Sequence, residues 1–457
     1  MASRSSSTFP LAHWLAPVAL LLAILIGGGG SPAPVPEIIL QSATAFLFGL
    51  WIWMLPGRIA DTVPGPALLC AAILLAVPLL QLIPLPPAVW HALPGRAAAR
   101  EALALIGQQD RWQTISLDPA RTLASFLAMA SASAILVMTA AMPAVQRWRI
   151  VAVLAAGGIL TVLLGAAQLS SSPGSPLYFY GSTAPLLAGF QANRNSTADV
   201  LLIAAIAIFA LIRHLARSGR SPWSGGVILA SGTAALLVMG LAVALTESRT
   251  GVVLLVVLAI GFGVFFRPWL RISPKVAMSS LLAAAGLIAV LHANPALNRV
   301  VQRFDAGSDL RREIWQDSVY VAQSNAPVGV GMGNFYPSYI AAERLESIGQ
   351  TVPNRAHNDY LELAVEAGVP GALALVLCLA ILLKSARSGL AAPRDDARQL
   401  ARFAVLALIV IALHSVVDYP LRSMSLAAIA AACAGLVIPA KPDRTANNGS
   451  NHHESAA

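Results

Sequence analysis

The chain has 457 residues, of which 57% are hydrophobic and only 11% are charged, and its mean hydropathy is +0.71. A soluble domain carries about 25% charged residues, so this composition excludes a soluble protein and indicates membrane-spanning segments. The net charge of +9 does not indicate nucleic-acid binding, because the basic residues lie in short loops between apolar runs.

Apolar runs recur along the chain and predict an all-α polytopic membrane protein, with about twelve spans in a single integral membrane domain, residues 1–457. The first span contains Pro17, and a cleaved signal peptide is the alternative interpretation of it. The predicted spans lie near Leu15–Gly28, Glu37–Leu55, Pro66–Ile83, Thr122–Met142, Ile150–Leu169, Ser196–Ile212, Gly226–Leu245, Gly251–Phe266, Val276–Leu291, Leu361–Leu383, Phe403–Val417 and Met424–Ile438.

One set of loops between these spans carries most of the arginines and all three lysines of the chain. The positive-inside rule places this set in the cytoplasm, together with both termini. The segment 441–457 is expected to be a disordered cytoplasmic tail.

The opposite set of loops includes two long ones, Pro84–Arg121 and His292–Tyr360. The first is rich in proline and contains tryptophan, which favours a segment lying at the membrane interface. The second is the most polar part of the chain. Within it, apolar residues at helical spacing predict a helix over Leu310–Gln323, followed by a glycine-rich turn at Pro327–Asn334. We therefore expect a partly helical periplasmic loop, residues 292–360, before the tenth span.

Polar residues gather at the ends of the spans on this second side, in four separate loops. They are Arg194 and Asn195; Glu247, Ser248 and Arg249; His357, Asn358 and Asp359; and Asp418, Tyr419 and Arg422. Polar groups at the mouth of a membrane helix are costly, so this gathering predicts a functional site.

Two of these arginines lie in short loops where positive charge is disfavoured by the topology. Because guanidinium groups bind phosphate in a bidentate way, Arg249 and Arg194 are candidates for holding a diphosphate. The alternative is local pairing, of Arg249 with Glu247 and of Arg194 with Asp199. Asp418 and Arg422 are interpreted as structural.

Arg311 and Arg312 open the predicted loop helix, where the helix dipole favours anions. The pair is consistent with an anion site made of guanidinium groups and helix amides. Pairing with Asp309 or Glu313 is the alternative explanation.

His357 is the histidine that lies beside a polar cluster, and its ordinary pKa near 6.5 suits it to take a proton from a hydroxyl group. Asp359 or Glu362 is expected to orient its second ring nitrogen. If Asn358 or Asp359 caps the tenth helix, Glu362 and Glu366 share one helix face. The alternative is that His357 only caps the helix. No metal-binding spacing of histidine or cysteine occurs in the sequence.

Six motifs, in this order, resemble the O-antigen ligase and polymerase family of bacterial polysaccharide assembly. They are FQANRN at Phe190–Asn195, ESRTG at Glu247–Gly251, RREIW at Arg311–Trp315, GVGMGNF at Gly329–Phe335, HNDYLELAVEAGVPG at His357–Gly371 and HSVVDYPLR at His414–Arg422. The resemblance is strongest over 196–383, the O-antigen ligase-like core.

The resemblance implies a GT-C-like protein of the bacterial inner membrane, with its active site facing the periplasm and no metal or nucleotide cofactor. The donor would be an undecaprenyl-diphosphate-linked saccharide, and the acceptor a lipid A–core sugar or a lipid-linked glycan. Membrane lipids and polysaccharide-assembly proteins are the other expected partners. Arg249 and Arg312, with Arg311 in reserve, would hold the diphosphate, and His357 would act on the acceptor as base or positioner.

Three functions are considered: a ligase, a repeat-unit polymerase and a flippase. A ligase and a repeat-unit polymerase share these motifs, and the second would act in O-antigen or exopolysaccharide assembly. A lipid-linked glycan flippase is the alternative from another class, but transporters place ionisable groups near the membrane midplane, and here they gather at one side.

Overall fold

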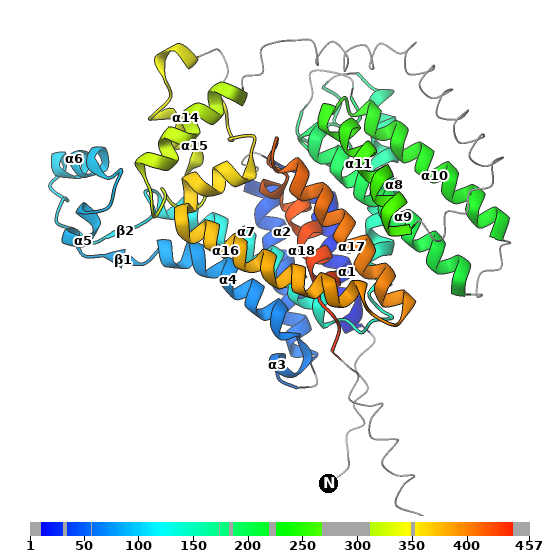
Figure 1. Cartoon of the computed structure of the whole chain (residues 1–457). Helices are drawn as coiled ribbons and strands as arrows, with labels where there is room; N and C mark the ends of the chain where they lie inside the picture. The colour runs from blue at the N-terminus through cyan, green and yellow to red at the C-terminus, as the bar shows by residue number, and fades with distance from the viewer. Residues whose placement is uncertain are drawn as a thin grey trace, which may run out of the picture.

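The computed structural model describes residues 11–30, 34–55, 57–172, 174–181, 186–218, 225–266, 311–348 and 352–441, and Figure 1 shows a bundle of apolar helices with a smaller polar part at one end. The apolar helices are α1 (Ala12–Ile26), α2 (Pro34–Trp53), α4 (Gly65–Gln81), α7 (Pro119–Ala141), α8 (Trp148–Leu169), α9 (Arg194–Ser218), α10 (Gly225–Leu245), α11 (Arg249–Phe266), α16 (Asp359–Leu390), α17 (Asp395–His414) and α18 (Met424–Val437).

A helix lies at eleven of the twelve predicted spans within the described residues, and the ninth, Val276–Leu291, lies outside them. Six of these helices are long and apolar enough to cross a membrane, and five more are apolar but shorter. The chain is therefore a multi-pass, mainly helical membrane protein. α1 is part of the main core and packs against α2 and α18.

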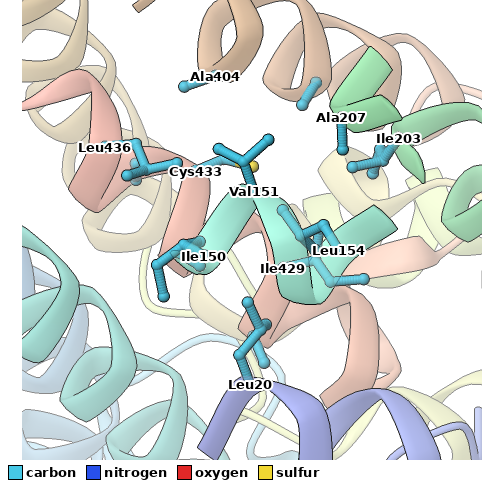
Figure 2. Close-up of a cluster of buried hydrophobic side chains, with 14 of the residues drawn as sticks. Leu20, Ile150, Val151, Leu154, Ile203, Ala207, Ala404, Ile429, Cys433 and Leu436 are labelled. Carbon is cyan, nitrogen blue, oxygen red and sulfur yellow. The ribbon is translucent and has the colours of Figure 1, made fainter. Parts of the chain in front are cut away.

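The core lies where α1, α8, α9, α17 and α18 meet, and Figure 2 shows side chains from all five helices converging there. Small residues let the helices approach closely. A Cβ atom added at Gly158 of α8 would lie 2.1 Å from the Cβ of Ala204 on α9. In a membrane, helices associate through such close packing because lipid tails are as apolar as the side chains.

The polar part, which we call the cap, consists of residues 82–118, 311–348 and 352–358. The described elements of the cap are the antiparallel strands β1 (Pro84–Leu85) and β2 (Gln113–Thr114), the helices α5 (Pro87–His91), α6 (Ala97–Leu105), α14 (Arg311–Ser324) and α15 (Phe335–Ile340), and the 3-10 turn η1 (Leu345–Ser347). Two further short elements, α3 (Ile59–Thr62) and the 3-10 turn η2 (Pro420–Arg422), lie outside the cap. α14 confirms the helix predicted over Leu310–Gln323.

A buried arginine joins the two halves of the cap. The guanidinium group of Arg96 donates to the side chain of Asn325 at 3.0 Å and to the carbonyls of Ile115 at 2.7 Å and Gly329 at 2.9 Å. Burial lowers the pKa of Arg96 to about 10, so the group remains a cation at neutral pH. The described parts of the two long loops predicted from the sequence are therefore joined.

The glycine-rich segment of the cap packs into a kink of α16. Pro370 has no amide hydrogen, and its ring excludes the helical bond to the carbonyl of Glu366. That carbonyl instead accepts from the Gly331 amide at 2.9 Å and from the Gln81 side chain at 2.9 Å. The Val365 carbonyl likewise accepts from Val330 at 3.0 Å. The cap thus satisfies the backbone groups that the kink leaves without helical partners.

Gly368 lies at the centre of the kink with a φ of 52° and a ψ of −140°, which side chains with a Cβ rarely adopt. A Cβ atom there would also lie 2.2 Å from the carbonyl oxygen of Pro327. This contact leaves room for glycine alone.

We expect Gly368→Ala to destabilise the protein by at least about 2 kcal/mol, from backbone strain and the clash with the cap. The measurement is the thermal unfolding midpoint of the purified protein in detergent. Gly49→Ala is the matched control, because a Cβ atom at Gly49 meets nothing within 4 Å. Equal midpoints for Gly368→Ala and wild type would contradict the expectation.

Candidate functional site

The four polar loops predicted from the sequence meet at the cap end of the bundle. A chain of hydrogen bonds links them: Ser248 donates to the Asn195 side chain at 2.6 Å, Asn195 donates to Asp418 at 2.6 Å, and Asp418 lies 3.0 Å from Nδ1 of His357. The second amide in the first loop, Asn193, donates to the same Asp418 oxygen as Asn195, at 3.0 Å. Residues far apart in the sequence therefore form one polar site.

His357 is held in a single orientation by its surroundings. Its backbone has a φ of 50°, a conformation that non-glycine residues adopt at a cost and that recurs at functional sites. The preceding carbonyl, of Ala356, accepts from the indole of Trp315 at 2.9 Å. The ring meets Tyr419 edge to face at 5.0 Å and is 28% exposed. The side chain that caps α16 is Asn358, which accepts from the Leu361 amide at 3.0 Å, so His357 is not the cap.

Asp418 is the carboxylate that orients His357, and it is 2% exposed. Burial by itself would raise the pKa of Asp418, but the hydrogen bond with His357, the nearby His414 and the Asn195 amide outweigh it, so the pKa lies below its ordinary value. The ionised Asp418 accepts from His357, which places the proton of a neutral imidazole on Nδ1 and leaves Nε2 able to accept a proton. Burial and the charge of Asp418 raise the pKa of Tyr419 to about 12.

Three helices begin at this site. α9 begins at Arg194, α11 at Arg249 and α16 at Asp359. Ser248 caps α11 by accepting from the Gly251 amide at 3.0 Å. The positive ends of three helix dipoles therefore converge with two arginines, an arrangement that favours a bound anion. Glu247 is buried in the turn before α11 with a φ of 55°.

The two arginines at the start of α14 face different surroundings. Arg312 is exposed, whereas Arg311 is partly buried. Which of the two would hold a diphosphate stays a prediction. Asp309, one predicted partner of this pair, lies outside the described residues, and Arg312 forms no ion pair with Glu313 or any other described carboxylate.

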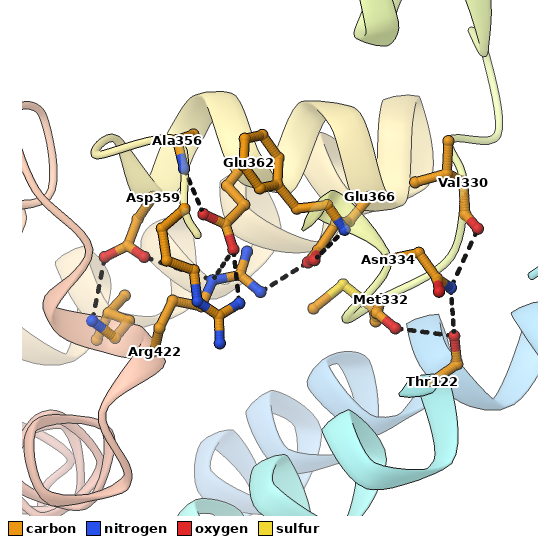
Figure 3. A network of polar contacts seen from close by, with 12 residues as sticks. Thr122, Val330, Met332, Asn334, Ala356, Asp359, Glu362, Glu366 and Arg422 are labelled. Carbon is orange, nitrogen blue, oxygen red and sulfur yellow. Dashed lines mark hydrogen bonds and ion pairs between the residues drawn. The ribbon is translucent and has the colours of Figure 1, made fainter. Parts of the chain in front are cut away.

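The expectation that Asp359 or Glu362 orients His357 is wrong. His357 precedes the helix and turns toward the loop after α17, while the two carboxylates on α16 point into a separate buried ion cluster (Figure 3). Glu362 accepts from Arg355 at 2.9 Å and from the Ala356 amide at 3.0 Å. Asp359 accepts from the Ser415 hydroxyl at 2.9 Å and from the Leu421 amide at 3.1 Å.

Arg422 is the centre of this cluster. It lies 2.6 Å from Glu366, 3.3 Å from Glu362 and 3.6 Å from Asp359. Glu362 and Glu366 do share one face of α16, as predicted. The cluster is structural: it ties the start of α16 to the loop before α18, and Glu366 also accepts from the Phe335 amide of the cap at 3.2 Å.

A second histidine–aspartate pair lies just inside the bundle. His414 and Asp199 are fully buried, with Nδ1 and Oδ1 2.6 Å apart. Asp199 therefore does not pair with Arg194, which corrects that alternative. The Asp418 amide donates to the His414 carbonyl at 2.9 Å, so this pair lies directly behind the Asp418 loop. Within the described ranges, no group of three or more His, Cys, Asp or Glu side chains is arranged to hold a metal ion.

Sequence reasoning assigned Asp418 a structural role and did not single out Asn193. The signal for both was their position in short polar loops next to spans. The sequence does not reveal their partners. Asp418 is 61 residues from His357 and 225 residues from Asn193, and such separations carry no information about pairing.

Asp418→Asn should lower the stability of the protein at neutral pH. A carboxyl with a lowered pKa in the folded state stabilises it above the unfolded pKa, about 4, and this contribution is lost as the pH falls through the folded value. The difference in thermal midpoint between wild type and Asp418→Asn should therefore shrink between pH 6 and pH 3. A difference in thermal midpoint that stays constant or grows as the pH falls would contradict this expectation.

The comparison with protein families matches residues 234–376 to the model described as O-antigen ligase. The matched segment holds Arg249, Arg311, Arg312 and His357, while Arg194 and Asp418 lie outside it. No curated protein matches the chain closely enough to count as a relative.

Members of this family are glycosyltransferase-like enzymes, and their substrates are lipid-linked glycans. The matched segment spans the helices α10, α11, α14, α15 and the kinked part of α16, and it contains the glycine-rich segment and the histidine loop that the structure brings together. Over residues 234–376, this membrane protein is therefore similar to the O-antigen ligase family.

Proposed function

We propose that the protein transfers a saccharide from an undecaprenyl-diphosphate carrier to an acceptor hydroxyl group, as an O-antigen ligase at the periplasmic face of the bacterial inner membrane. The observation that carries this proposal is the His357–Asp418 pair, joined through Asn195 and Ser248 to the start of the helix that bears Arg249. A proton acceptor and an anion-binding region therefore lie in one site.

The acceptor hydroxyl loses its proton to Nε2 of His357 while its oxygen attacks the anomeric carbon of the donor sugar. The bond from that carbon to the diphosphate oxygen breaks, and the electron pair leaves with the polyprenyl diphosphate. Asp418 acts through His357: it holds the ring and stabilises the imidazolium that forms, in the way a buried carboxylate does in other histidine-dependent enzymes.

The leaving group gains negative charge in this step, and cations placed around it lower the barrier. Arg249 and Arg312 are the first candidates for this role, with Arg311 in reserve, and Arg194 is a further candidate. The converging starts of α9 and α11 contribute helix dipoles of the same sign. Glu247 and Asn358 support the site by shaping the two turns, and the mechanism assigns no step to a metal or a nucleotide.

The distribution of ionisable groups favours an enzyme over a flippase. Asp199 is five residues into α9, about 7.5 Å from the start of that helix, and His414 is the last residue of α17. These groups stay near one end of the bundle, and a transporter would be expected to place its site near the membrane midplane.

His357→Ala should reduce glycan transfer at least about 100-fold, because the step loses its proton acceptor. The assay uses membranes that contain the variant, a lipid-linked glycan and the acceptor, with the amount of protein measured by immunoblot. His91→Ala is the matched control, since His91 bonds the Gln109 carbonyl within the cap. Full activity of His357→Ala at normal protein levels would overturn the proposed role.

Arg249→Lys should lose most of the transfer activity even though it keeps the positive charge, because lysine cannot form two parallel hydrogen bonds to a phosphate. The expected loss is about tenfold or more in kcat/KM for the donor. Arg100→Lys, at an exposed position of α6, serves as the control. A wild-type rate would assign Arg249 a point-charge or structural role.

A repeat-unit polymerase is the second candidate, because the matched family includes both activities. Deleting the gene separates them. A ligase deletion accumulates complete lipid-linked polymer that is not attached to its acceptor. A polymerase deletion leaves single repeat units that do not lengthen. Unchanged surface glycans would exclude both activities in the organism tested.

A further inference from the structure

Three consecutive aromatic residues lie in the loop between α8 and α9. The outer two are anchored to the protein: the Tyr178 hydroxyl donates to the Gln168 carbonyl at 2.9 Å, and the Tyr180 hydroxyl donates to the Ile26 carbonyl at 3.4 Å. Phe179, between them, is 57% exposed. The two anchored neighbours therefore hold Phe179 at the surface in a defined place.

Phe190, later in the same loop, packs against this exposed ring. The two phenyl rings stack with their centroids 6.1 Å apart and 27° between their planes. The backbone of Phe190 is close to the segment after α1, since a Cβ atom at Gly28 would lie 1.8 Å from the Phe190 carbonyl oxygen. The Ala192 amide also donates to the Gly28 carbonyl at 2.9 Å. We call Phe179 and Phe190 the aromatic pair, and these contacts fix its place on the bundle.

The aromatic pair lies beside the site around His357. Phe190 is three residues before Asn193, one of the amides of that hydrogen-bonded site, and three residues of chain span at most about 11 Å. The segment after α1 makes a second link. A Cβ atom at Gly30 would lie 3.2 Å from the ring of Tyr419, which meets His357 edge to face at 5.0 Å.

The loop that carries the aromatic pair is polar where it leaves the bundle. Residues 170–176 follow the last residue of α8 and include four serines. Phe179 is therefore separated along the chain from the apolar helix before it. Phe46 differs in this respect: it is 70% exposed within α2, an apolar helix long enough to cross a membrane. This contrast favours a ligand at Phe179 other than the lipid chains that surround α2.

We propose that the aromatic pair binds a sugar ring of the substrate, with Phe179 as the stacking surface. The inference rests on the proposed function, because it takes the ligand of the neighbouring site to be a glycan. One face of a sugar ring presents C–H bonds with partial positive charge, and the face of a phenyl ring is negative. Ligand sites combine such aromatic surfaces with a few polar groups, which the amides and His357 supply here.

The sugar ring belongs either to the donor or to the acceptor, since both must approach His357 during transfer. The chemistry of stacking is the same for the two. Binding measurements on each substrate separate these sources.

The test measures dissociation constants for the full-length protein in nanodiscs by microscale thermophoresis. The ligands are a lipid-linked glycan as donor, lipid A–core as acceptor, and undecaprenyl diphosphate, which carries no sugar. Phe179→Leu keeps an apolar side chain and removes the aromatic face. It should raise the dissociation constant of at least one sugar-bearing ligand about fivefold and leave that of undecaprenyl diphosphate unchanged. The ligand that is affected identifies the source of the sugar ring.

Two further variants serve as controls. Phe179→Tyr retains the aromatic face and should bind all three ligands as wild type does. Phe46→Leu makes the same substitution at the exposed phenylalanine of α2 and should leave all three dissociation constants unchanged. The thermal midpoint of each variant shows whether it is folded.

The proposal is overturned if neither sugar-bearing ligand binds the wild type, or if Phe179→Leu binds both as tightly as wild type does. An equal weakening of undecaprenyl diphosphate would assign Phe179 to the polyprenyl chain, and an equal loss in Phe179→Tyr would exclude stacking as the cause. The binding assay needs no turnover. If the wild type transfers no glycan but Phe179→Leu still weakens a sugar-bearing ligand, the sugar site stands and the proposed function fails.

Discussion

The kink of α16 is the constraint on which the arrangement of the site depends. Within a membrane, each backbone amide and carbonyl group needs a partner from the protein, because lipid offers none. Gly368 and Pro370 free the carbonyls of Val365 and Glu366, and the glycine-rich segment of the cap supplies the missing donors. This requirement fixes the cap on the bundle at one place, and the loop that carries His357 runs between the two.

The buried ion cluster continues this attachment toward the site. Arg422 joins three carboxylates of α16 to the loop before α18, and the same loop region carries Asp418. Removing charges from water is expensive, and the cluster is tolerable because its members are paired with one another or with backbone amides. The ion cluster holds the loop that carries Asp418 beside the start of α16, and Asp418 thereby reaches His357.

The two ends of the bundle handle charge in different ways. At the cap end, Asp418 accepts from neutral amides and from His357, and Arg194 and Arg249 lie at the starts of helices. At the other end, Asp395 contacts Arg213, Arg217 and Arg398. At the cap end, the proposed function adds the diphosphate of the donor to this arrangement of arginines and helix starts.

The sequence by itself determined the membrane class, the positions of eleven helices within the described residues, the cap helix α14 and the similarity of residues 234–376 to the O-antigen ligase family. These follow from local patterns, because apolar run length and helical periodicity are carried by neighbouring residues. Only the tertiary structure decided that Asp418 and not Asp359 orients His357, and that Asp199 pairs with His414. Those pairings depend on which helix ends lie side by side, and they join residues 61 and 215 positions apart in the sequence, which no local pattern connects.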